Sequence, residues 1–183
     1  MYELLQRQEE ERLERQRKVL ELTSDTFASL FADYPTSRAR DISRAERIEH
    51  GYISSTLSYG EILFEPFQRL LTSLYKHGFS PESGGKFVDI GSGIGKAIFA
   101  AALCHQFNSC VGIEILSSLH HLAERPVSEK WRKLAQSKHK GKNNIDISFI
   151  RGDAQFLEHI WQEADVVFAH WTAFGSDLVH KYS

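Results

Sequence analysis

The N-terminal part of the chain has the hydrophobic and polar pattern of helices. Residues 1–22 are strongly charged, and oppositely charged side chains four positions apart, such as Glu14 and Lys18, predict an exposed helical arm. The polar stretch "TSDTF" then predicts the end of that helix. Residues 23–82 predict a helix, a polar loop and a further helix, in which Phe67 and several leucines recur at helical spacing. We therefore expect an arm followed by an N-terminal helical segment.

From residue 83 onward, the pattern becomes an alternation of strands and helices. Continuous apolar runs predict strands at "KFVDI", "SCVGIEI", "IDISFIRGD" and "ADVVFAH", and helical sequence follows each of them. Such an alternation is typical of a parallel sheet with helices on both faces. The predicted fold class is therefore α/β, a Rossmann-like doubly wound parallel sheet over residues 83–183, with its ligand beyond the carboxyl ends of the strands.

Composition narrows the class of protein but not its chemistry. Hydrophobic residues make up 42% and charged residues 25% of the 183 residues, which suits one globular domain with an appendage. The formal net charge of −2 lacks the basic surface of a protein that grips nucleic acid, so we expect no sequence-specific nucleic-acid binding. No apolar run is long enough to span a bilayer, and we expect a soluble, intracellular protein without a membrane partner. The spacing of the histidines and of the two cysteines predicts no metal site.

The stretch "FVDIGSGIGK", at residues 87–96, is a glycine turn between a strand and a helix, and three kinds of ligand use such turns. A phosphate loop needs four residues between its first glycine and the Gly-Lys pair, but only three separate Gly91 from Gly95, and alanine follows the lysine. A dinucleotide turn needs a wider glycine spacing and gains nothing from the carboxylate of Asp89, which would repel a pyrophosphate. The ammonium and sulfonium of S-adenosylmethionine (AdoMet) suit that carboxylate, so the turn favours AdoMet.

Acidic residues also stand at the ends of the next two predicted strands. Glu114 can accept hydrogen bonds from the hydroxyls of a ribose, and Asp153 can accept one from an adenine amine. The alternative for each acid is the capping of a helix N-terminus. Capping remains possible for any one of Asp89, Glu114 and Asp153. A single bound ligand explains all three acids together better than capping does.

Short motifs carry a resemblance to a known family, and they occur in the family's order. They are "SYGEIL" (58–63), "FVDIGSGIGK" (87–96), "VGIE" (111–114), "KWRK" (130–133), "RGD" (151–153) and "ADVVFAHWTAFG" (164–175). The chain resembles the class I AdoMet-dependent methyltransferases and, among them, the histone lysine methyltransferase family named for the disruption of telomeric silencing. The glycine motif is shared by the whole class, whereas "YGE" together with "AFG" is much more specific to the family.

The resemblance implies AdoMet as the cofactor and assigns residues to it. Tyr59, Gly60 and Glu61 would form a loop over the cofactor, for which the alternative is an ordinary helix N-terminus. Glu114 would hold the ribose. The methionine end would be lined by Asp89, Gly91, Ser92, Gly93, Gly95 and Lys96, and the adenine would be flanked by Asp153 and Ala154.

The chain departs from the family pattern in two places. Where the family has a pair of asparagines before Phe-Ala-Phe-Gly, this chain has His170 and Trp171. His170 could act as a general base and Trp171 could stack on the sulfonium or line the channel; alternatively, the two could cap a strand and fill the core. The sequence also ends at Ser183, shortly after the fourth predicted strand, so we expect a truncated sheet whose open edge favours self-association.

These observations support one leading function and two alternatives. We expect an AdoMet-dependent methyltransferase that acts on lysine in a protein substrate, with a histone or nucleosome as the candidate acceptor. The alternatives are a non-catalytic AdoMet-binding or regulatory module, and a methyltransferase with a non-histone acceptor. The expected location is the nucleus for a histone-directed enzyme and the cytoplasm otherwise.

Overall fold

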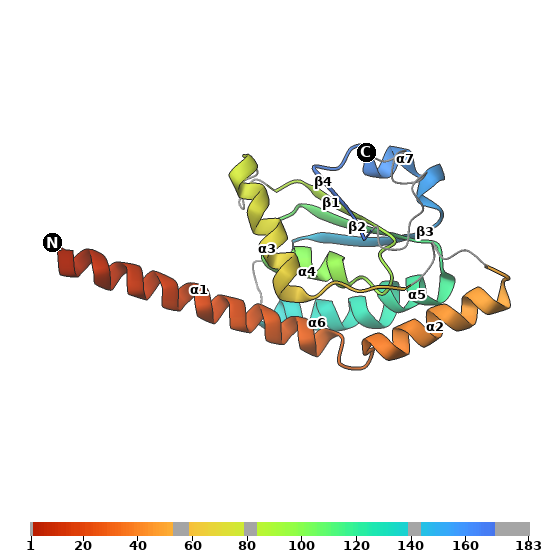
Figure 1. Ribbon diagram of the computed structural model, residues 1–183, viewed down its shortest axis with the longest axis horizontal. Helices are drawn as coiled ribbons and strands as arrows, with labels where there is room; N and C mark the ends of the chain where they lie inside the picture. Colours follow the sequence, from red (N-terminus) through yellow and green to blue (C-terminus); the bar gives the residue numbers. More distant parts are fainter. Residues whose placement is uncertain (1, 53–58, 79–83, 139–143, 171–183) are drawn as a thin grey trace.

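The computed structural model describes residues 2–52, 59–78, 84–138 and 144–170 (Figure 1). N-terminal helices come first, and strands then alternate with helices, as the sequence predicts. In chain order, the elements are α1 (Tyr2–Leu30), α2 (Thr36–Glu49), α3 (Phe64–Leu74), the 3₁₀ turn η2 (Tyr75–His77), β1 (Lys86–Ile90), α4 (Lys96–Cys104), β2 (Ser109–Glu114), α5 (Ser117–Leu122), the π-helical turn η3 (Ala123–Val127), α6 (Ser128–Lys138), β3 (Asp146–Arg151), the 3₁₀ turn η5 (Ala154–Phe156), α7 (Glu158–Trp161) and β4 (Val166–Ala169).

A parallel four-stranded sheet forms the centre of the fold, in the order β3-β2-β1-β4. Asp89 of β1 pairs with Gly112 of β2, and Ile90 of β1 pairs with Ala169 of β4. Because the strand order reverses direction at β1, the space beyond the ends of β1 and β4 is the switch point at which open α/β sheets bind ligands. The predicted Rossmann-like parallel sheet is confirmed.

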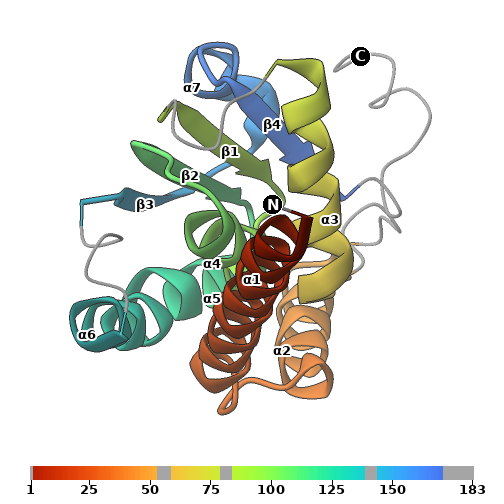
Figure 2. The same ribbon diagram turned by 90° about the vertical axis from the view of Figure 1, so that its left-hand side faces the viewer.

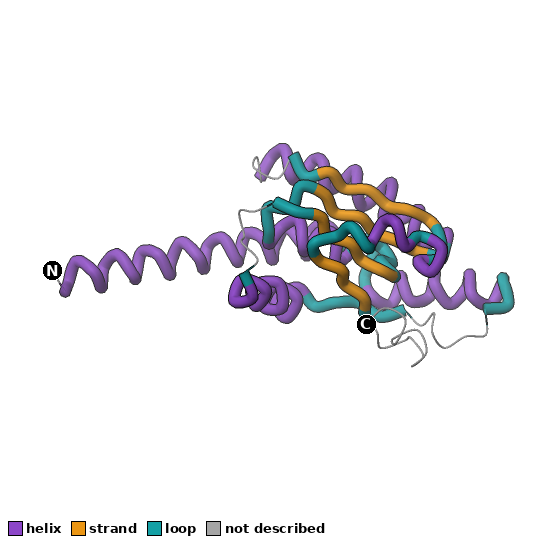
Figure 3. The backbone as a smooth tube through the Cα atoms, turned by 90° about the horizontal axis from the view of Figure 1, so that it is seen from above, coloured by secondary structure: helices purple, strands orange, loops and turns teal. Residues whose placement is uncertain are grey.

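Helices cover the two faces of this sheet unequally (Figures 1 and 3). The N-terminal helices and α4 to α6 lie on one face, where Phe87 and Phe99 belong to the main hydrophobic core. On the other face, Val88 and Ile113 belong to a smaller core, against which Trp161 of α7 packs. Successive residues of β1 therefore enter different cores, as the period of a strand requires.

Helix α1 is longer than the sequence predicts. It continues through "TSDTF" to Leu30, so the predicted end of the arm near residue 22 falls inside a helix. The hydroxyl of Thr26 donates to the carbonyl of Leu22 at 2.8 Å, which satisfies this polar side chain without ending the helix. Phe27 is buried, and its ring centre lies 4.9 Å from that of Phe64 in α3. Packing of the aromatic side chains against the domain thus outweighs the local preference for a turn.

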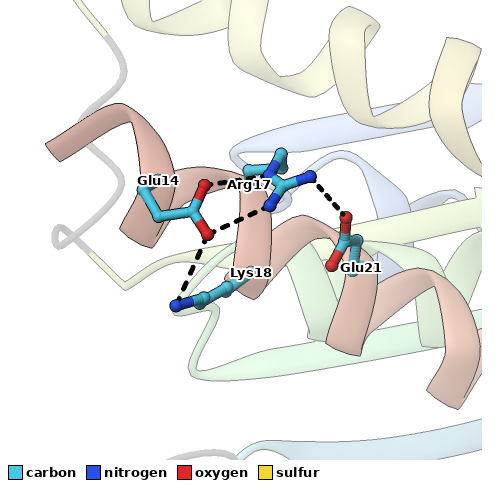
Figure 4. A network of polar contacts seen from close by, with 4 residues as sticks. All are labelled: Glu14, Arg17, Lys18 and Glu21. Carbon is cyan, nitrogen blue, oxygen red and sulfur yellow. Dashed lines mark hydrogen bonds and ion pairs between the residues drawn. The ribbon is translucent and has the colours of Figure 1, made fainter. Parts of the chain in front are cut away.

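The N-terminal part of α1 extends away from the rest of the chain (Figures 1 and 3) and points toward the viewer in Figure 2. Near the middle of α1, Arg17 lies 3.0 Å from Glu14 and 3.6 Å from Glu21, and Lys18 lies 3.4 Å from Glu14 (Figure 4). The hydrogen bond from Arg17 lowers the pKa of Glu14. The predicted pairing of Glu14 with Lys18 is confirmed, although exposed pairs of this kind stabilise a helix only slightly. Within the described part of the chain, no helix has both the length and the apolar character needed to cross a membrane.

Candidate functional site

The glycine turn joins the end of β1 to the start of α4. Gly91, Gly93 and Gly95 have φ angles of 78°, 55° and 86°, in the left-handed region that glycine adopts without strain. The N–H groups of Gly91 and Ser92 both donate to the carbonyl of Ile113, at 2.9 and 3.0 Å, so the turn is fixed against the end of β2. The side-chain oxygen of Ser92 is buried and has no hydrogen-bond partner among the described residues.

Glu114, the last residue of β2, connects the glycine turn to the turn that follows β2. One carboxylate oxygen accepts from the N–H of Gly93, and the other accepts from the N–H of Leu116, both at 2.8 Å. Burial raises the pKa of this carboxyl, while the hydrogen bonds from Leu116 and Gly93 act in the opposite direction. Each carboxylate oxygen retains a further lone pair, so Glu114 can accept hydrogen bonds from a ligand as well.

Asp89 lies next to this carboxylate but has a different environment. Its side chain is buried, with only 3% of the residue exposed, and no hydrogen bond from the described residues lowers its pKa. Burial and then the negative charge of Glu114 raise its pKa to about 8. The site therefore contains two neighbouring buried acids, one of which accepts no hydrogen bond from the described part of the chain, and this arrangement is suited to a cationic ligand.

Tyr59 and Glu61 lie directly over the glycine turn. A Cβ atom placed on Gly93 would lie 2.9 Å from Cε2 of the Tyr59 ring, so the ring contacts the backbone of the turn closely. The hydroxyl of Tyr59 donates to Glu61 at 2.6 Å. Because α3 begins only at Phe64, these residues precede the helix instead of forming its first turn, and the helix alternative for them was wrong. Gly60, between them, is exposed.

Two residues from separate helices hold the Glu61 carboxylate. Lys96, the first residue of α4, donates to it at 2.6 Å in a largely buried ion pair, and the Thr36 hydroxyl donates to the same oxygen. The Lys96 ammonium also lies 5.3 Å from the ring centre of Phe31. The sequence places Lys96 near the glycine turn but gives no sign of Thr36, because a threonine that begins a helix after proline is ordinary.

Asp153 and Ala154, which the family resemblance assigns to the adenine, make hydrogen bonds with residues close to them in the sequence. Asp153 follows β3 and accepts a hydrogen bond from the N–H of Gln155 at 2.9 Å, which makes it the N-cap of η5. The capping alternative therefore describes Asp153 in this structure. Ala154 is buried, and its carbonyl accepts from the indole N–H of Trp161 at 3.0 Å.

The two predicted catalytic residues are only partly described. His170 follows the last residue of β4 and is half-buried. The pairing of Ile90 with Ala169 places His170 at the same edge of the sheet as the glycine turn. Trp171 lies outside the described residues. Within the described ranges, no three or more histidine, cysteine and acidic side chains form a group that could hold a metal ion.

Comparison with known families adds a second line of evidence. The model of the family described as "Histone methylation protein DOT1" matches residues 39–183. This chain belongs to the DOT1 family. The match includes the Tyr59–Glu61 segment, the glycine turn and the four described strands, β1 to β4. No curated protein is similar enough to this chain to be matched to it.

Solved structures of low sequence identity also match this DOT1-family chain. A putative AdoMet-dependent methyltransferase from Methanococcus maripaludis is 15% identical, with a TM-score of 0.42, over 80% of this chain and 55% of that one. The plantazolicin methyltransferase BpumL, in complex with S-adenosylhomocysteine (SAH), is 20% identical, with a TM-score of 0.41, over 84% and 49%. A phosphoethanolamine N-methyltransferase from Haemonchus contortus is 18% identical, with a TM-score of 0.38, over 75% and 26%. The chain thus spans about half of these proteins or less.

Proposed function

We propose that this DOT1-family chain contains the AdoMet site of a protein methyltransferase, with lysine of a histone or nucleosome as the acceptor. One observation supports AdoMet as the cofactor. The Asp89 carboxyl is buried beside that of Glu114, and no hydrogen bond from the described residues lowers its pKa. The ammonium and sulfonium of AdoMet bring the positive charge that this pair lacks. A nicotinamide dinucleotide would instead bring a negative pyrophosphate to the same turn.

We propose the following roles for the residues of the turn and its cover. Asp89 would bind the ammonium, Glu114 the ribose hydroxyls, and the backbone of the glycine turn would lie along the methionine end. The close contact of the Tyr59 ring with Gly93 leaves no room for a larger residue there, which supports Tyr59 as part of the cover. We assign the adenine to the neighbourhood of Ala154 and Asp153, which retains a second carboxylate oxygen.

Bound AdoMet supplies a methyl group that its sulfonium makes electrophilic. The chain has then to orient donor and acceptor and to exclude water. Tyr59 and Glu61 cover the turn, and Lys96 holds Glu61 in place. An acceptor lysine must lose a proton, and we propose His170 as the base because it lies at this edge of the sheet and a neutral imidazole can accept a proton. We assign Trp171 to the wall of the acceptor channel.

Membership in the DOT1 family supports the histone acceptor, and with it a nuclear location. One observation favours a second candidate, an AdoMet-binding module without transferase activity. His170 and Trp171 stand where the family resembled by this chain has a pair of asparagines, which the resemblance assigns to the neighbourhood of the methyl group. A methyltransferase with another protein or small-molecule acceptor would also retain the same cofactor site.

Calorimetry with AdoMet, SAH and NAD tests the cofactor directly. We expect AdoMet and SAH to bind and to raise the melting temperature, and NAD to do neither. Absence of AdoMet and SAH binding would refute the assignment. Transfer of radiolabel from AdoMet to nucleosomes, to free histones and to unrelated proteins then identifies the acceptor. AdoMet binding without any transfer would favour the binding module.

Removal of the Tyr59 hydroxyl should loosen the cover. Tyr59→Phe keeps the ring against Gly93 but deletes the hydrogen bond to Glu61, so we expect AdoMet binding to weaken by roughly threefold to tenfold. Tyr52→Phe is the matched control, because Tyr52 is exposed and its ring stacks on His50. Calorimetry on the two variants and the wild type measures the effect. Equal weakening in both variants would argue against a role for the Tyr59 hydroxyl.

A further inference from the structure

Helix α2 contacts both sides of the candidate site, although it belongs to neither the sheet nor the glycine turn. At its first residue, the Thr36 hydroxyl donates to the carboxylate of Glu61, in the segment that covers the turn. Ten residues further along the same helix, the carboxylate of Glu46 accepts from the N–H groups of Ser117 and Ser118, at 2.7 and 2.8 Å. These contacts span 25 and about 70 positions of sequence, so they are tertiary and not local.

The contact made by Glu46 lies next to the contact made by Glu114. Leu116, whose N–H donates to Glu114, directly precedes Ser117 and Ser118, whose N–H groups donate to Glu46. Three consecutive N–H groups, those of Leu116 and of the first two residues of α5, are thus held by two carboxylates. Burial would raise the pKa of Glu46, but the hydrogen bonds from Ser118 and Ser117 outweigh it and lower the pKa, so this carboxylate is ionised at neutral pH.

The contact made by Thr36 also joins α2 to a carboxylate of the candidate site, on the side of the covering segment. Glu61 is a largely buried carboxylate whose oxygens accept from Tyr59, Lys96 and Thr36. Tyr59 and Lys96 belong to the cover and the glycine turn themselves, whereas Thr36 connects both to α2. Helix α2 also packs against α5, whose first two residues donate to Glu46.

We propose that α2 holds the two sides of the cofactor site in a fixed relative position, with Thr36 acting through Glu61, and Glu46 acting through the Leu116–Ser118 segment that binds Glu114. This inference rests on the proposed function. Thr36 and Glu46 are positioning residues. Thr36 contacts Glu61 of the covering segment, and Glu46 contacts the N–H groups of Ser117 and Ser118, which directly follow Leu116, the donor to Glu114. A site whose covering segment and ribose side are fixed before binding loses less conformational entropy when the ligand enters, and it therefore binds more tightly.

Two substitutions with matched controls on the same helix test the inference. Thr36→Val removes the hydroxyl at nearly constant volume, with Thr36→Ser as the conservative variant and exposed Ser37→Ala as the control. Glu46→Gln turns an amide N–H₂ toward a backbone donor, with exposed Glu49→Gln as the control for the same change of charge. We expect Thr36→Val and Glu46→Gln each to weaken AdoMet binding roughly threefold to tenfold, and Thr36→Ser and both controls to bind as the wild type.

Double variants separate positioning from a general loss of stability. Each positioning substitution should weaken binding little when its target is already changed. We therefore expect Thr36→Val to add little to Glu61→Gln, and Glu46→Gln to add little to Glu114→Gln. Additive losses of affinity in both pairs, or wild-type affinity in Thr36→Val and Glu46→Gln, would overturn the inference. Melting temperatures of all variants identify any that are unfolded.

Hydrogen exchange of the ligand-free protein gives a readout that does not depend on AdoMet. In Glu46→Gln, the amides of Ser117 and Ser118 should exchange faster than in the wild type and in Glu49→Gln. Unchanged exchange would overturn the role of Glu46. If wild-type protein fails to bind AdoMet while this exchange is faster in Glu46→Gln, the proposed function fails and the support that α2 gives to this turn stands.

Discussion

Asp89→Asn is expected to weaken AdoMet binding by about a hundredfold or more and, at the same time, to stabilise the ligand-free protein near neutral pH. The carboxylate is buried at the end of β1, and the ammonium of AdoMet is its proposed partner. Removing one partner of a buried, hydrogen-bonded charge pair costs about 3–5 kcal/mol, which is a factor of at least about a hundred in affinity.

The expected stabilisation follows from the pKa of Asp89. Burial and the charge of Glu114 raise this pKa from 3.8 to about 8, so the folded, ligand-free protein binds the proton more tightly than the unfolded chain does. The stabilisation from this group is fully present below pH 3.8 and is lost as the pH rises through about 8. Between these values the loss is up to about 1.4 kcal/mol per pH unit. Asparagine carries no charge and avoids that loss.

Melting temperatures between about pH 4 and pH 8 and calorimetry with AdoMet measure the two effects. Asp41→Asn is the matched control, because it makes the same chemical change at an exposed position of α2. We expect the wild type to lose stability relative to Asp89→Asn as the pH rises, and Asp41→Asn to follow the wild type. Unchanged AdoMet affinity in Asp89→Asn would refute its assignment to the ammonium, and a lower melting temperature near neutral pH would refute the burial argument.

The sheet and the glycine turn could be predicted because their signals are local in the sequence. Apolar runs that alternate with helical sequence specify the parallel strands, and three glycines at fixed spacing specify a turn that needs positive φ at each of them. The placement of Asp89 and Glu114 at neighbouring strand ends follows from the parallel order. The position of Tyr59 over the turn came from the family resemblance, since nothing in the spacing connects residue 59 with residue 93.

The parts that could not be predicted depend on contacts between distant segments. The end of α1 was misplaced because Thr26 is compatible with a turn or a helix, and only the burial of Phe27 against Phe64 decides between them. Thr36 and Glu46 belong to a helix whose sequence is that of an ordinary charged surface. Their roles arise from residues 61 and 117–118, which the chain brings to them only in the folded state.

Gly112 is another residue whose importance becomes visible only in the structure. It lies in the middle of β2, opposite Phe149 of β3. A Cβ atom at this position would lie 2.6 Å from Cδ1 of Phe149 and 2.7 Å from the buried side-chain oxygen of Ser92. The Phe149 ring lies over the glycine and reaches Phe99, with ring centres 5.8 Å apart. Glycine thus leaves the space that this ring and the glycine turn share.

Gly112→Ala is expected to destabilise the protein by about 1–3 kcal/mol, because an added methyl group in a closely packed core forces its neighbours to move. For a chain of this size, the melting temperature should fall by roughly 3–10 °C. AdoMet binding should weaken as well, since displacement of Ser92 moves the glycine turn. Thermal unfolding and calorimetry measure the two effects in the same samples.

Gly152→Ala is the matched control for the steric argument. A Cβ atom there would contact only the flexible end of Leu157, which can rotate away, so we expect a small change in melting temperature. Phe149→Leu should restore part of the stability lost in Gly112→Ala, because the smaller side chain vacates the space that the methyl group needs. If Gly112→Ala and Gly152→Ala are equally stable, or if Phe149→Leu adds its full cost to Gly112→Ala, the overlap with the Phe149 ring is not what requires glycine in β2.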